Sequence, residues 1–251
     1  MRPKKHFGQN FLMDGGAISR IAALCVSRAG ERVVEIGAGT GALTKALLER
    51  GAVVTALEID PDLIGILRGR DDLADANVVE ADALEFDYAA ASGDSAWCAA
   101  GNLPYNIATS LVLKWLALES PPERIVAMLQ RDVADRLIAR PSTPQYGSLT
   151  LFVNYAVHVR REFVLRPSVF YPQPKVESAV VVMERRAQPA VAVRDRDFFL
   201  QVVRGAFAYR RKTLANSLSL ALGIERTRTQ SALASLQIDT EIRAEQLDLG
   251  A

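Results

Sequence analysis

Short apolar runs alternate with helical patterns through the first two thirds of the chain. The apolar runs predict strands at residues 32–36, 53–58, 77–81, 96–100 and 125–129. The patterns among them predict helices at residues 43–49, 62–68, 107–118 and 133–139. Strands that alternate with helices in this way are typical of a parallel sheet covered on both faces. We therefore expect an α/β fold.

The pattern changes in the last third of the chain. Two longer apolar runs, residues 149–159 and 178–184, have no helix between them and are joined by a proline-rich segment. We expect them to form an antiparallel pair of strands at the edge of the sheet. After Arg194 the strand pattern stops, and helices are predicted at residues 197–208, 211–222, 226–236 and near Glu241. The predicted domains are residues 1–190 and a small all-helical domain, residues 191–251.

Charge is distributed unevenly, although the net charge of the 251 residues is only +1. Residues 1–12 carry +3, residues 13–160 carry −6 and residues 194–228 carry +5. Charge clusters of one sign create a local field even when the total is near zero. An acidic body flanked by basic stretches therefore suggests a polyanionic partner, and an ordinary solvated surface is the alternative.

The cysteine and hydropathy patterns exclude several classes of protein. Cys25 and Cys98 are the only cysteines, and neither belongs to a Cys-x-x-Cys pair or lies near a histidine cluster, so we expect no metal site and no disulfide framework. The basic start has no apolar segment behind it. No stretch approaches the length of about 18 uncharged apolar residues that a membrane span needs. We expect a cytoplasmic protein that does not bind to a membrane.

The tetrapeptide Asn102-Leu103-Pro104-Tyr105 follows the fourth predicted strand. It gathers a side-chain carbonyl, a main-chain carbonyl fixed ahead of proline and an aromatic face. The carbonyls of Asn102 and Leu103 can accept both hydrogens of an exocyclic amine. Tyr105 can stack on the ring that carries this amine, at roughly 1–3 kcal/mol per stacked base. Adenine N6 fits such a cluster, and the alternative is a proline turn with a satisfied asparagine cap and a core tyrosine.

Glycines close the first predicted strand in the segment 35–41, Glu-Ile-Gly-Ala-Gly-Thr-Gly. Between a strand and a helix, such glycines let a ligand approach the backbone at the carboxyl edge of a sheet. Gly37, Gly39 and Ala42 also satisfy the loose dinucleotide spacing. Two features argue against a nicotinamide cofactor. A third glycine at position 41 suits a cationic amino-acid portion, and Glu35 suits its amino group.

Acidic residues end the next two predicted strands. Glu58 can accept both ribose hydroxyls of a nucleoside, through charge-assisted bonds worth roughly 1.5–3 kcal/mol. Asp82 can bond an adenine edge. Either acid alone is more often a surface carboxylate. Three successive strand ends that each carry a glycine loop or an acid nevertheless predict a binding site.

S-adenosylmethionine beside a nucleobase explains both halves of this pattern. Its sulfonium is already a strong electrophile, so methyl transfer to N6 needs alignment more than it needs a base. Two carbonyl acceptors aimed at the N6 hydrogens favour a pyramidal, reactive nitrogen, and the proton can leave afterwards to solvent. We therefore interpret His6 and His158 as non-catalytic.

With these residues, the chain resembles the ribosomal RNA adenine N6-dimethyltransferase family from Lys4 to about Leu247. The segment 7–12, Phe-Gly-Gln-Asn-Phe-Leu, resembles the family's N-terminal motif, and Phe-Tyr-Pro-Gln-Pro-Lys-Val at 170–176 resembles its substrate-side loop. The resemblance implies a Rossmann-like class I methyltransferase fold with a mostly parallel seven-stranded sheet. The implied cofactor-binding residues are Gln9, Asn10, Leu12, Glu35, Gly37, Gly39, Glu58, Ile59, Asp82, Ala83 and Asn102. The implied catalytic residues are Asn102, Leu103, Pro104, Tyr105 and Phe170, the last as a second aromatic wall around the base.

The resemblance also implies an RNA partner. The segment 207–218 resembles the basic helix that opens the family's RNA-facing domain. Expected RNA contacts are Lys4, Lys5, Lys175, Arg210, Arg211 and Lys212. The implied substrate is a pair of adjacent adenines near the 3′ end of 16S ribosomal RNA in an assembling 30S subunit, modified by a monomer that also serves subunit biogenesis. The family usually continues with another helix, whereas this chain stops at Ala251, so we expect a trimmed small domain.

Three other functions are weighed against this one. A large-subunit RNA methyltransferase of the drug-resistance type would share the cofactor and adenine motifs, but the match in the proline loop and the basic helix argues against it. A non-catalytic ribosome-assembly factor on the same fold is opposed by the intact acids and the intact 102–105 cluster. A nicotinamide oxidoreductase leaves that cluster and the basic helix unexplained.

Overall fold

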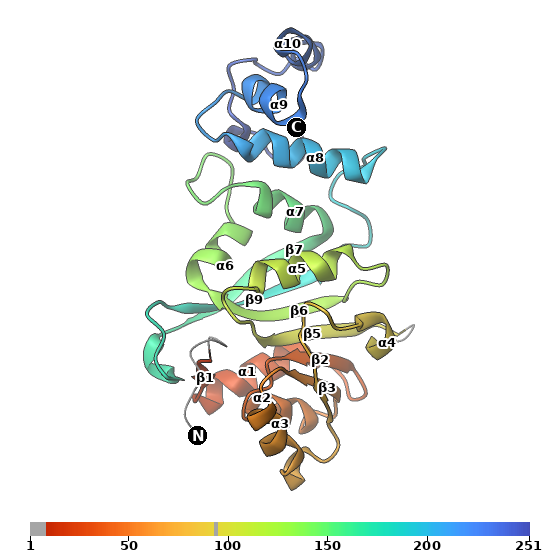
Figure 1. The fold of residues 1–251 in the computed structure, drawn as a ribbon, viewed down its shortest axis with the longest axis vertical. Coiled ribbons are helices and arrows are strands. Elements are labelled where there is room, and N and C mark those ends of the chain that lie inside the picture. Colours follow the sequence, from red (N-terminus) through yellow and green to blue (C-terminus); the bar gives the residue numbers. More distant parts are fainter. Residues whose placement is uncertain (1–8, 93–94) are drawn as a thin grey trace. The chain divides into compact units, whose positions relative to one another are not determined.

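A computed structural model describes residues 9–92 and 95–251 (Figure 1). Contacts group the chain into two compact units. The first, here called the sheet unit, extends to Ala134 and includes Val159–Arg185. The second, the helical unit, comprises Asp135–His158 and Arg186–Ala251. The grouping differs from the predicted boundary after residue 190, because residues 135–158 join the C-terminal helices. The division into two domains itself stays a prediction.

A seven-stranded sheet runs through the sheet unit in the order β4-β3-β2-β5-β6-β9-β7. Five strands are parallel, namely β2 (Arg32–Ile36), β3 (Val53–Glu58), β4 (Asn77–Glu80), β5 (Trp97–Asn102) and β6 (Arg124–Gln130). The other two are β9 (Ser178–Arg185), which is antiparallel to β6, and β7 (Val157–Leu165) at the edge. The predicted mostly parallel seven-stranded sheet is confirmed.

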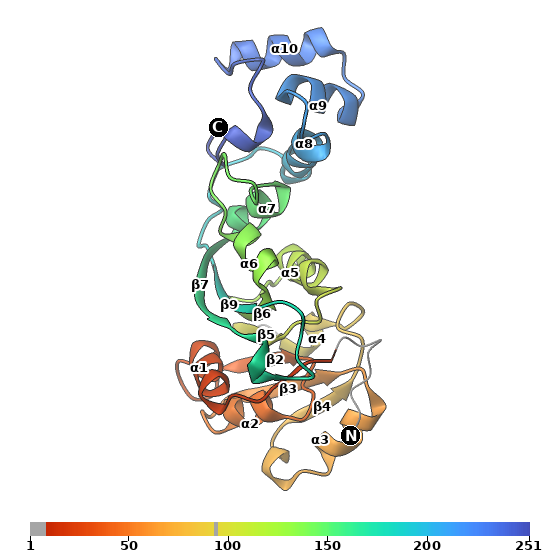
Figure 2. The same cartoon turned by 90° about the vertical axis from the view of Figure 1, so that its left-hand side faces the viewer.

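Helices cover both faces of this sheet because successive side chains of a strand point to opposite faces. Cys98 of β5 lies in the same core cluster as Cys25 of the first helix. Its neighbour Trp97 stacks on Tyr88 on the other face, with ring centroids 5.6 Å apart. Figure 2 shows the sheet between the helices on its two faces. The helices of the unit are α1 (Gly15–Cys25), α2 (Ala42–Leu48), α3 (Pro61–Arg68), η2 (Asp71–Leu73), α4 (Tyr88–Ser92) and α5 (Ala108–Ala117).

A small second sheet brings the N-terminal motif to the substrate-side loop. Strand β1 (Phe11–Leu12) pairs antiparallel with β8 (Phe170–Tyr171), which follows the short helix η3 (Pro167–Val169). The register sets Phe11 opposite Tyr171 and Leu12 opposite Phe170. Two motifs from opposite ends of the sheet unit's sequence therefore lie side by side.

The helical unit has its own apolar core. One cluster joins Leu214, Leu218 and Leu233. Tyr155 and Phe199 pack with ring centroids 4.9 Å apart, which explains why residues 135–158 group with the C-terminal helices. The helices here are α7 (Ser148–Ala156), α8 (Arg196–Ala208), α9 (Leu214–Leu222), α10 (Arg226–Ser235) and η4 (Ala244–Gln246), and α6 (Arg131–Leu137) spans the boundary between the units.

The prediction of a strand at residues 149–159 is wrong, since the chain is helical to Ala156 and β7 begins only at Val157. The Thr150 hydroxyl accepts the Gly147 N–H at 3.2 Å and donates to the Arg136 carbonyl at 2.7 Å, so it fixes the start of the helix. Buried side chains lie on several sides of α7. A short, mostly apolar helix that is buried on several sides shows only a weak 3.6-residue period and resembles a buried strand in the sequence.

Two further differences concern helices. Helix α1 was not predicted, although Asp14 caps it by accepting the Ala17 N–H at 2.9 Å. The helix expected near Glu241 is a single 3-10 turn, Ala244–Gln246. Across residues 9–92 and 95–251, none of the helices is both long enough and apolar enough to span a membrane.

Candidate active site

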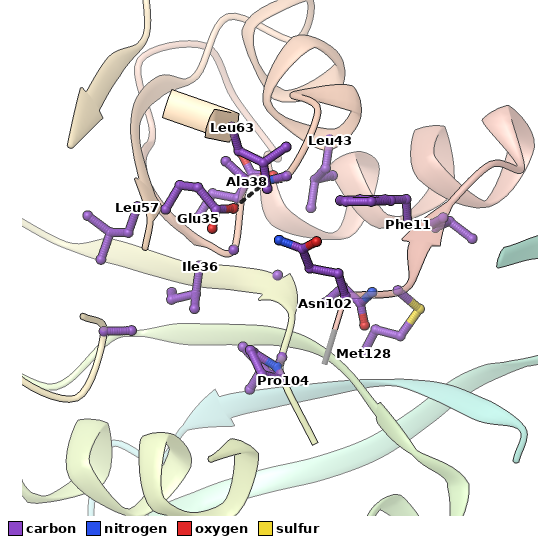
Figure 3. Close-up of a pocket in the computed structure, with 18 of the residues that line it drawn as sticks. Phe11, Glu35, Ile36, Ala38, Leu43, Leu57, Leu63, Asn102, Pro104 and Met128 are labelled. Atoms are coloured by element: carbon purple, nitrogen blue, oxygen red, sulfur yellow. Dashed lines mark hydrogen bonds between the residues drawn. The ribbon is translucent and has the colours of Figure 1, made fainter. Parts of the chain in front are cut away.

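A cavity opens at the carboxyl ends of the parallel strands in the sheet unit (Figure 3). All eleven candidate cofactor residues line it, together with Leu103, Pro104 and Tyr105 of the adenine cluster. They come from β1, from the ends of β2, β3 and β5, and from the loop after β4. The cavity also takes apolar walls from residues that the motifs did not single out. These include Phe11, Ile36, Leu43, Leu57, Leu63 and Met128.

The glycine segment after β2 folds against β3. The N–H groups of Gly37 and Ala38 both donate to the Leu57 carbonyl, at 2.9 and 3.1 Å. Gly41 lies outside the cavity lining and has φ +83°, and a Cβ there would be 2.4 Å from the Leu73 side chain. Packing of the α2 start against η2 therefore explains the third glycine, which the sequence had suggested was suited to a ligand.

Glu35 ends up inside the fold, with only 2% of its surface exposed. Its Oε2 accepts the Thr44 hydroxyl at 2.6 Å. Burial raises the pKa of Glu35 to about 8, and the negative charge of Glu58 adds to this effect. At neutral pH the side chain is therefore mostly a neutral carboxylic acid that joins β2 to α2 and lines the cavity.

Glu58 fixes the backbone around the cavity. Its Oε2 accepts the Gly39 N–H at 2.8 Å, while Oε1 accepts the N–H groups of Ile59 and Asp60 at 2.9 and 3.1 Å. A carboxylate has about four acceptor positions, so three are used by the fold. The glycine segment and the start of α3 are thus held by one side chain.

Asp60 is a site residue that the motifs missed. It is 1% exposed and accepts the side-chain amide of Gln9 at 2.8 Å, so it ties the N-terminal segment to β3. It also caps α3 by accepting the Asp62 N–H at 3.1 Å. An aspartate directly before Pro61 is a helix-start signal in the sequence. Asp82, in contrast, is exposed, and its Oδ1 accepts the Leu84 N–H at 2.8 Å.

The adenine cluster is fixed from several sides. The Asn102 amide donates to the Asn10 carbonyl at 2.8 Å, which leaves its Oδ1 as an acceptor. The Leu103 N–H donates to the Met128 carbonyl at 3.1 Å. The Tyr105 hydroxyl lies 3.0 Å from Ser178 Oγ. Asn102 does not cap α5, whose cap position is Ile107, so the proline-turn alternative loses its asparagine cap.

Close packing of two strands directs Asn102 into the cavity. Gly101 has φ +153°, and a Cβ at this position would lie 2.4 Å from the Ile36 carbonyl oxygen. Strands β5 and β2 can approach this closely only with glycine here. After Gly101, the chain therefore ends β5 next to the end of β2, where the glycine segment begins.

The structure differs from the sequence prediction at Phe170. This ring is 3% exposed, belongs to the core cluster that includes Val180, and is not among the cavity-lining residues. Its expected place as a second wall around the base is therefore not found here, because apolar packing in the core holds it. Tyr171, the next residue, is 60% exposed and lies opposite Phe11 in the two-stranded sheet.

The charged part of the predicted basic helix forms a turn between two helices. Helix α8 ends at Ala208, and α9 starts at Leu214 after the Thr213 hydroxyl has accepted the Asn216 N–H. We call residues 210–212 the basic turn. Arg210 donates to the Pro144 carbonyl at 3.0 Å and contacts Glu245 at 3.2 Å, so it belongs to the internal structure of the helical unit.

The other basic candidates are solvent-facing as well, and Arg210 is itself exposed despite its contacts. Arg211, Lys212 and Lys175 are exposed. Lys4 and Lys5 lie outside the described residues, as do the first two residues of the N-terminal motif. No cluster of three or more histidine, cysteine, aspartate or glutamate side chains in the described part of the chain could hold a metal ion.

The cavity fits an adenosine-containing ligand with a cationic tail. Buried acids at the ends of two strands, an exposed acid after a third, and apolar walls surround one opening. The same opening holds the amide of Asn102 beside the main chain of the N-terminal segment. A ligand bound on the acidic strands would thus be adjacent to the cluster suited to an exocyclic amine.

A family model described as ribosomal RNA adenine dimethylase matches residues 1–250 of this chain. The chain belongs to this family. Ribosomal RNA small subunit methyltransferase A of Geobacter sulfurreducens is 41% identical over 254 residues, with 99% of this chain and 92% of that protein covered. The protein of the same description from Pseudomonas aeruginosa is 41% identical over 253 residues, with 100% and 92% covered. The family resemblance read from the motifs is confirmed.

Solved structures of similar fold include a dimethyladenosine transferase and a ribosomal RNA methyltransferase. A dimethyladenosine transferase from Plasmodium falciparum has a TM-score of 0.81 at 24% identity, with 95% of this chain and 93% of that chain covered, which shows the fold. The 23S rRNA methyltransferase ErmE has a TM-score of 0.71 at 27% identity, with 94% and 96% covered. The predicted class I methyltransferase fold of this dimethylase-family chain is confirmed.

Proposed function

We propose that this chain is an S-adenosylmethionine-dependent dimethyltransferase acting on N6 of two adjacent adenines near the 3′ end of 16S ribosomal RNA. The substrate is an assembling 30S subunit in the cytoplasm, the enzyme acts as a monomer, and its action contributes to subunit biogenesis. The observation that carries the proposal is the match to small subunit methyltransferase A relatives at about 41% identity across nearly the whole chain. The two adjoining halves of the cavity, the acidic strand ends and the cluster at residues 102–105, suit the binding of the cofactor and of the target adenine.

The cofactor would bind along the acidic strand ends. Glu58 and Asp82 would face the ribose and the adenine edge, while Asn10 and Leu12 would close the site from the N-terminal segment. Glu35 lies at the inner end of the glycine segment. When bound, S-adenosylmethionine supplies a methyl group on a cationic sulfur that keeps the bonding electron pair as the methyl leaves. The cluster at residues 102–105 then only has to present the target nitrogen.

The chain's own residues bind and orient the target adenine. Asn102 Oδ1 and a main-chain carbonyl of the cluster accept the N6 hydrogens, which localises the nitrogen lone pair toward the methyl group. Tyr105 stacks on the base and fixes its plane. Asn102 is itself held by the Asn10 carbonyl, so the acceptor is in place before the base arrives. The N6 proton leaves to solvent after transfer, which requires no histidine.

Exposed cations of both units support an RNA partner. Arg211 and Lys212 project from the basic turn, and Lys175 is exposed on the substrate-side segment. Phosphate contacts of this kind position an RNA without reading its sequence. Arg210 is excluded from this set because its guanidinium is held by the loop carbonyl of Pro144 and by Glu245.

The proposal is tested by transfer of labelled methyl to small ribosomal subunits that lack adenine dimethylation, followed by digestion to nucleosides. Label in N6,N6-dimethyladenosine is the expected result. Subunits that are already dimethylated are the matched control and should accept no label. Binding of S-adenosylmethionine without any transfer would overturn the enzyme assignment in favour of the non-catalytic assembly factor.

A second candidate is a large-subunit RNA methyltransferase. The similarity of fold to the 23S rRNA methyltransferase ErmE favours keeping it in the test. The identity to that protein is 27%, against about 41% for the small-subunit relatives. Labelled methyl found only on large-subunit RNA, with both subunits offered in equal amounts, would replace the main proposal by this one.

A further inference from the structure

A buried serine contacts the aromatic residue of the adenine cluster. Ser178 Oγ lies 3.0 Å from the Tyr105 hydroxyl, within hydrogen-bonding distance. Ser178 is 0% exposed, whereas Tyr105 is half-buried beside the cavity. A hydrogen bond from a fully buried partner has little competition from water. The far end of the Tyr105 ring is therefore tied to the fold while one side of the ring remains accessible.

Ser178 is presented by a rigid part of the sheet unit. It is the first residue of β9 and lies opposite Gln130 at the end of β6. Just before it, the Glu177 carbonyl accepts the Arg131 N–H at 2.9 Å. Pairing with the end of β6 and the adjacent Arg131–Glu177 bond leave the Ser178 Cβ little freedom. A hydroxyl held in this way can fix a neighbouring group to within a fraction of an ångström.

The backbone end of Tyr105 is fixed as well. The carbonyl of Pro104 accepts the N–H groups of Ile107 and Ala108, both at 3.0 Å, and so joins the motif to the start of α5. A tyrosine held at its backbone and at its hydroxyl has the long axis of its ring fixed, and the in-plane preference of the phenolic O–H favours one tilt of the ring about that axis. The plane of this ring sets the plane of any base that stacks on it.

We propose that Ser178 is a positioning residue that holds Tyr105 in the orientation needed to stack on the target base. The inference rests on the proposed function, because it concerns the base-binding half of the same cavity. Ser178 also terminates the substrate-side segment that begins at Phe170, so the contact joins this segment to the adenine cluster. The contact between Ser178 and Tyr105 is not needed for cofactor binding.

The test is a double-mutant cycle on methyl transfer to undimethylated small subunits. Ser178→Ala and Tyr105→Phe each remove the same hydrogen bond from one side, and each should lower kcat by about 2- to 10-fold. The double variant should be no slower than the slower single variant, because the bond can be lost only once. The KM for the subunit should change by less than about twofold, since phosphate contacts elsewhere are kept.

Two further measurements separate positioning from a general structural role. The affinity for S-adenosylmethionine, measured by calorimetry, should be unchanged in both single variants. Ser168→Ala, an exposed serine in η3 just before the substrate-side segment, is the matched control and should leave kcat unchanged. Effects of the two variants that multiply in the double variant would overturn the proposal, as would full activity of Ser178→Ala.

A readout without RNA keeps this inference distinct from the proposed function. In protein labelled at the hydroxyl-bearing ring carbon of its six tyrosines, Tyr105→Phe identifies the Tyr105 signal by its loss. Ser178→Ala should shift this signal and leave the other five in place. An unmoved signal overturns the positioning role even if the wild-type enzyme methylates small subunits. A shifted signal in a protein that transfers no methyl overturns the proposed function and leaves the contact supported.

Discussion

The cavity of the sheet unit and the basic turn of the helical unit place their ionisable side chains in opposite environments. Glu35 and Glu58, which line the cavity, and Asp60, which lies next to its lining, are each at most 6% exposed and are bonded to backbone or side-chain donors. In the turn, Arg211 and Lys212 are exposed. Binding in the cavity depends on the direction of each donor and acceptor atom, whereas binding at the basic turn depends on the sign of its charge. Substitutions that preserve charge but change geometry should therefore affect only the first.

Loss of the stacking ring should have the largest effect. Tyr105→Ala removes a stack worth roughly 1–3 kcal/mol, so kcat/KM for the RNA substrate should fall by about 10- to 100-fold. Affinity for S-adenosylmethionine should stay within about twofold, because all candidate cofactor residues except Asn102 belong to other strand ends or to the N-terminal segment. Methyl-transfer kinetics and calorimetry measure the two quantities. An equal loss of cofactor affinity would contradict the division of the cavity into two halves.

Glu58→Gln removes the negative charge and one acceptor oxygen at nearly constant shape. The amide has one acceptor oxygen, so its NH2 group must face at least one of the backbone N–H groups that Glu58 now accepts. We expect the free energy of unfolding to fall by about 2 kcal/mol and the Kd for S-adenosylmethionine to rise by about 10-fold. Glu80→Gln makes the same change at the exposed end of β4 and should alter neither. Equal results for both variants would show that burial does not matter.

Glu35 gives the sheet unit a pH dependence. Because its pKa is raised to about 8 in the folded chain, the native state binds more protons than the unfolded state between about pH 4.5 and pH 8. The free energy of unfolding should therefore fall as the pH rises through this window, by at most about 1.4 kcal/mol per pH unit. Glu35→Gln stays neutral and still accepts the Thr44 hydroxyl.

The variant should match the wild type near pH 5 and exceed its stability at pH 8, by about 1–2 kcal/mol after relaxation of the site. Urea unfolding at several pH values measures the difference. A constant difference across the window would mean that Glu35 does not titrate there.

The smallest expected effect concerns the basic turn. Reversing Arg211 and Lys212 to glutamate should weaken subunit binding by about 3- to 10-fold and reduce its salt dependence, with a slope lower by about 2. Stability should not change. Arg210→Ala should do the opposite, because it removes a contact inside the helical unit and lowers Tm. Arg50→Glu, at an exposed residue of the sheet unit, is the control for a charge reversal elsewhere on the surface. Unaltered binding would mean that the turn is an ordinary solvated surface.

The sequence predicted the parallel strands well and one helix badly, for the same reason. Buried parallel strands are continuous apolar runs, and Val53–Glu58 has the predicted bounds. Helix α7 is also mostly apolar, and its tertiary contacts distinguish it from a strand. Local capping chemistry was available for α1, where Asp14 marks the start, but it was not read.

The predicted cofactor residues meet in one cavity because the sequence marks strand ends directly, through glycines and acids. Contacts between distant segments leave no such mark. Nothing near Asp60 in the sequence indicates that Gln9 will reach it. Likewise, the chain around Phe170 does not reveal that this ring packs into the core while its neighbour is exposed. The basic triplet was placed on a helix because the Thr213 cap was overlooked.

Gly101 shows how a residue without a side chain can be essential for the activity of the protein. A Cβ there would lie 2.4 Å from the Ile36 carbonyl oxygen, so the first atom of any replacement side chain collides with the neighbouring strand. Among random missense variants selected for lost activity, codon 101 should recur as often as the codons of the adenine cluster. A map of intolerant positions would then mark a catalytic site at a residue that contributes no functional group.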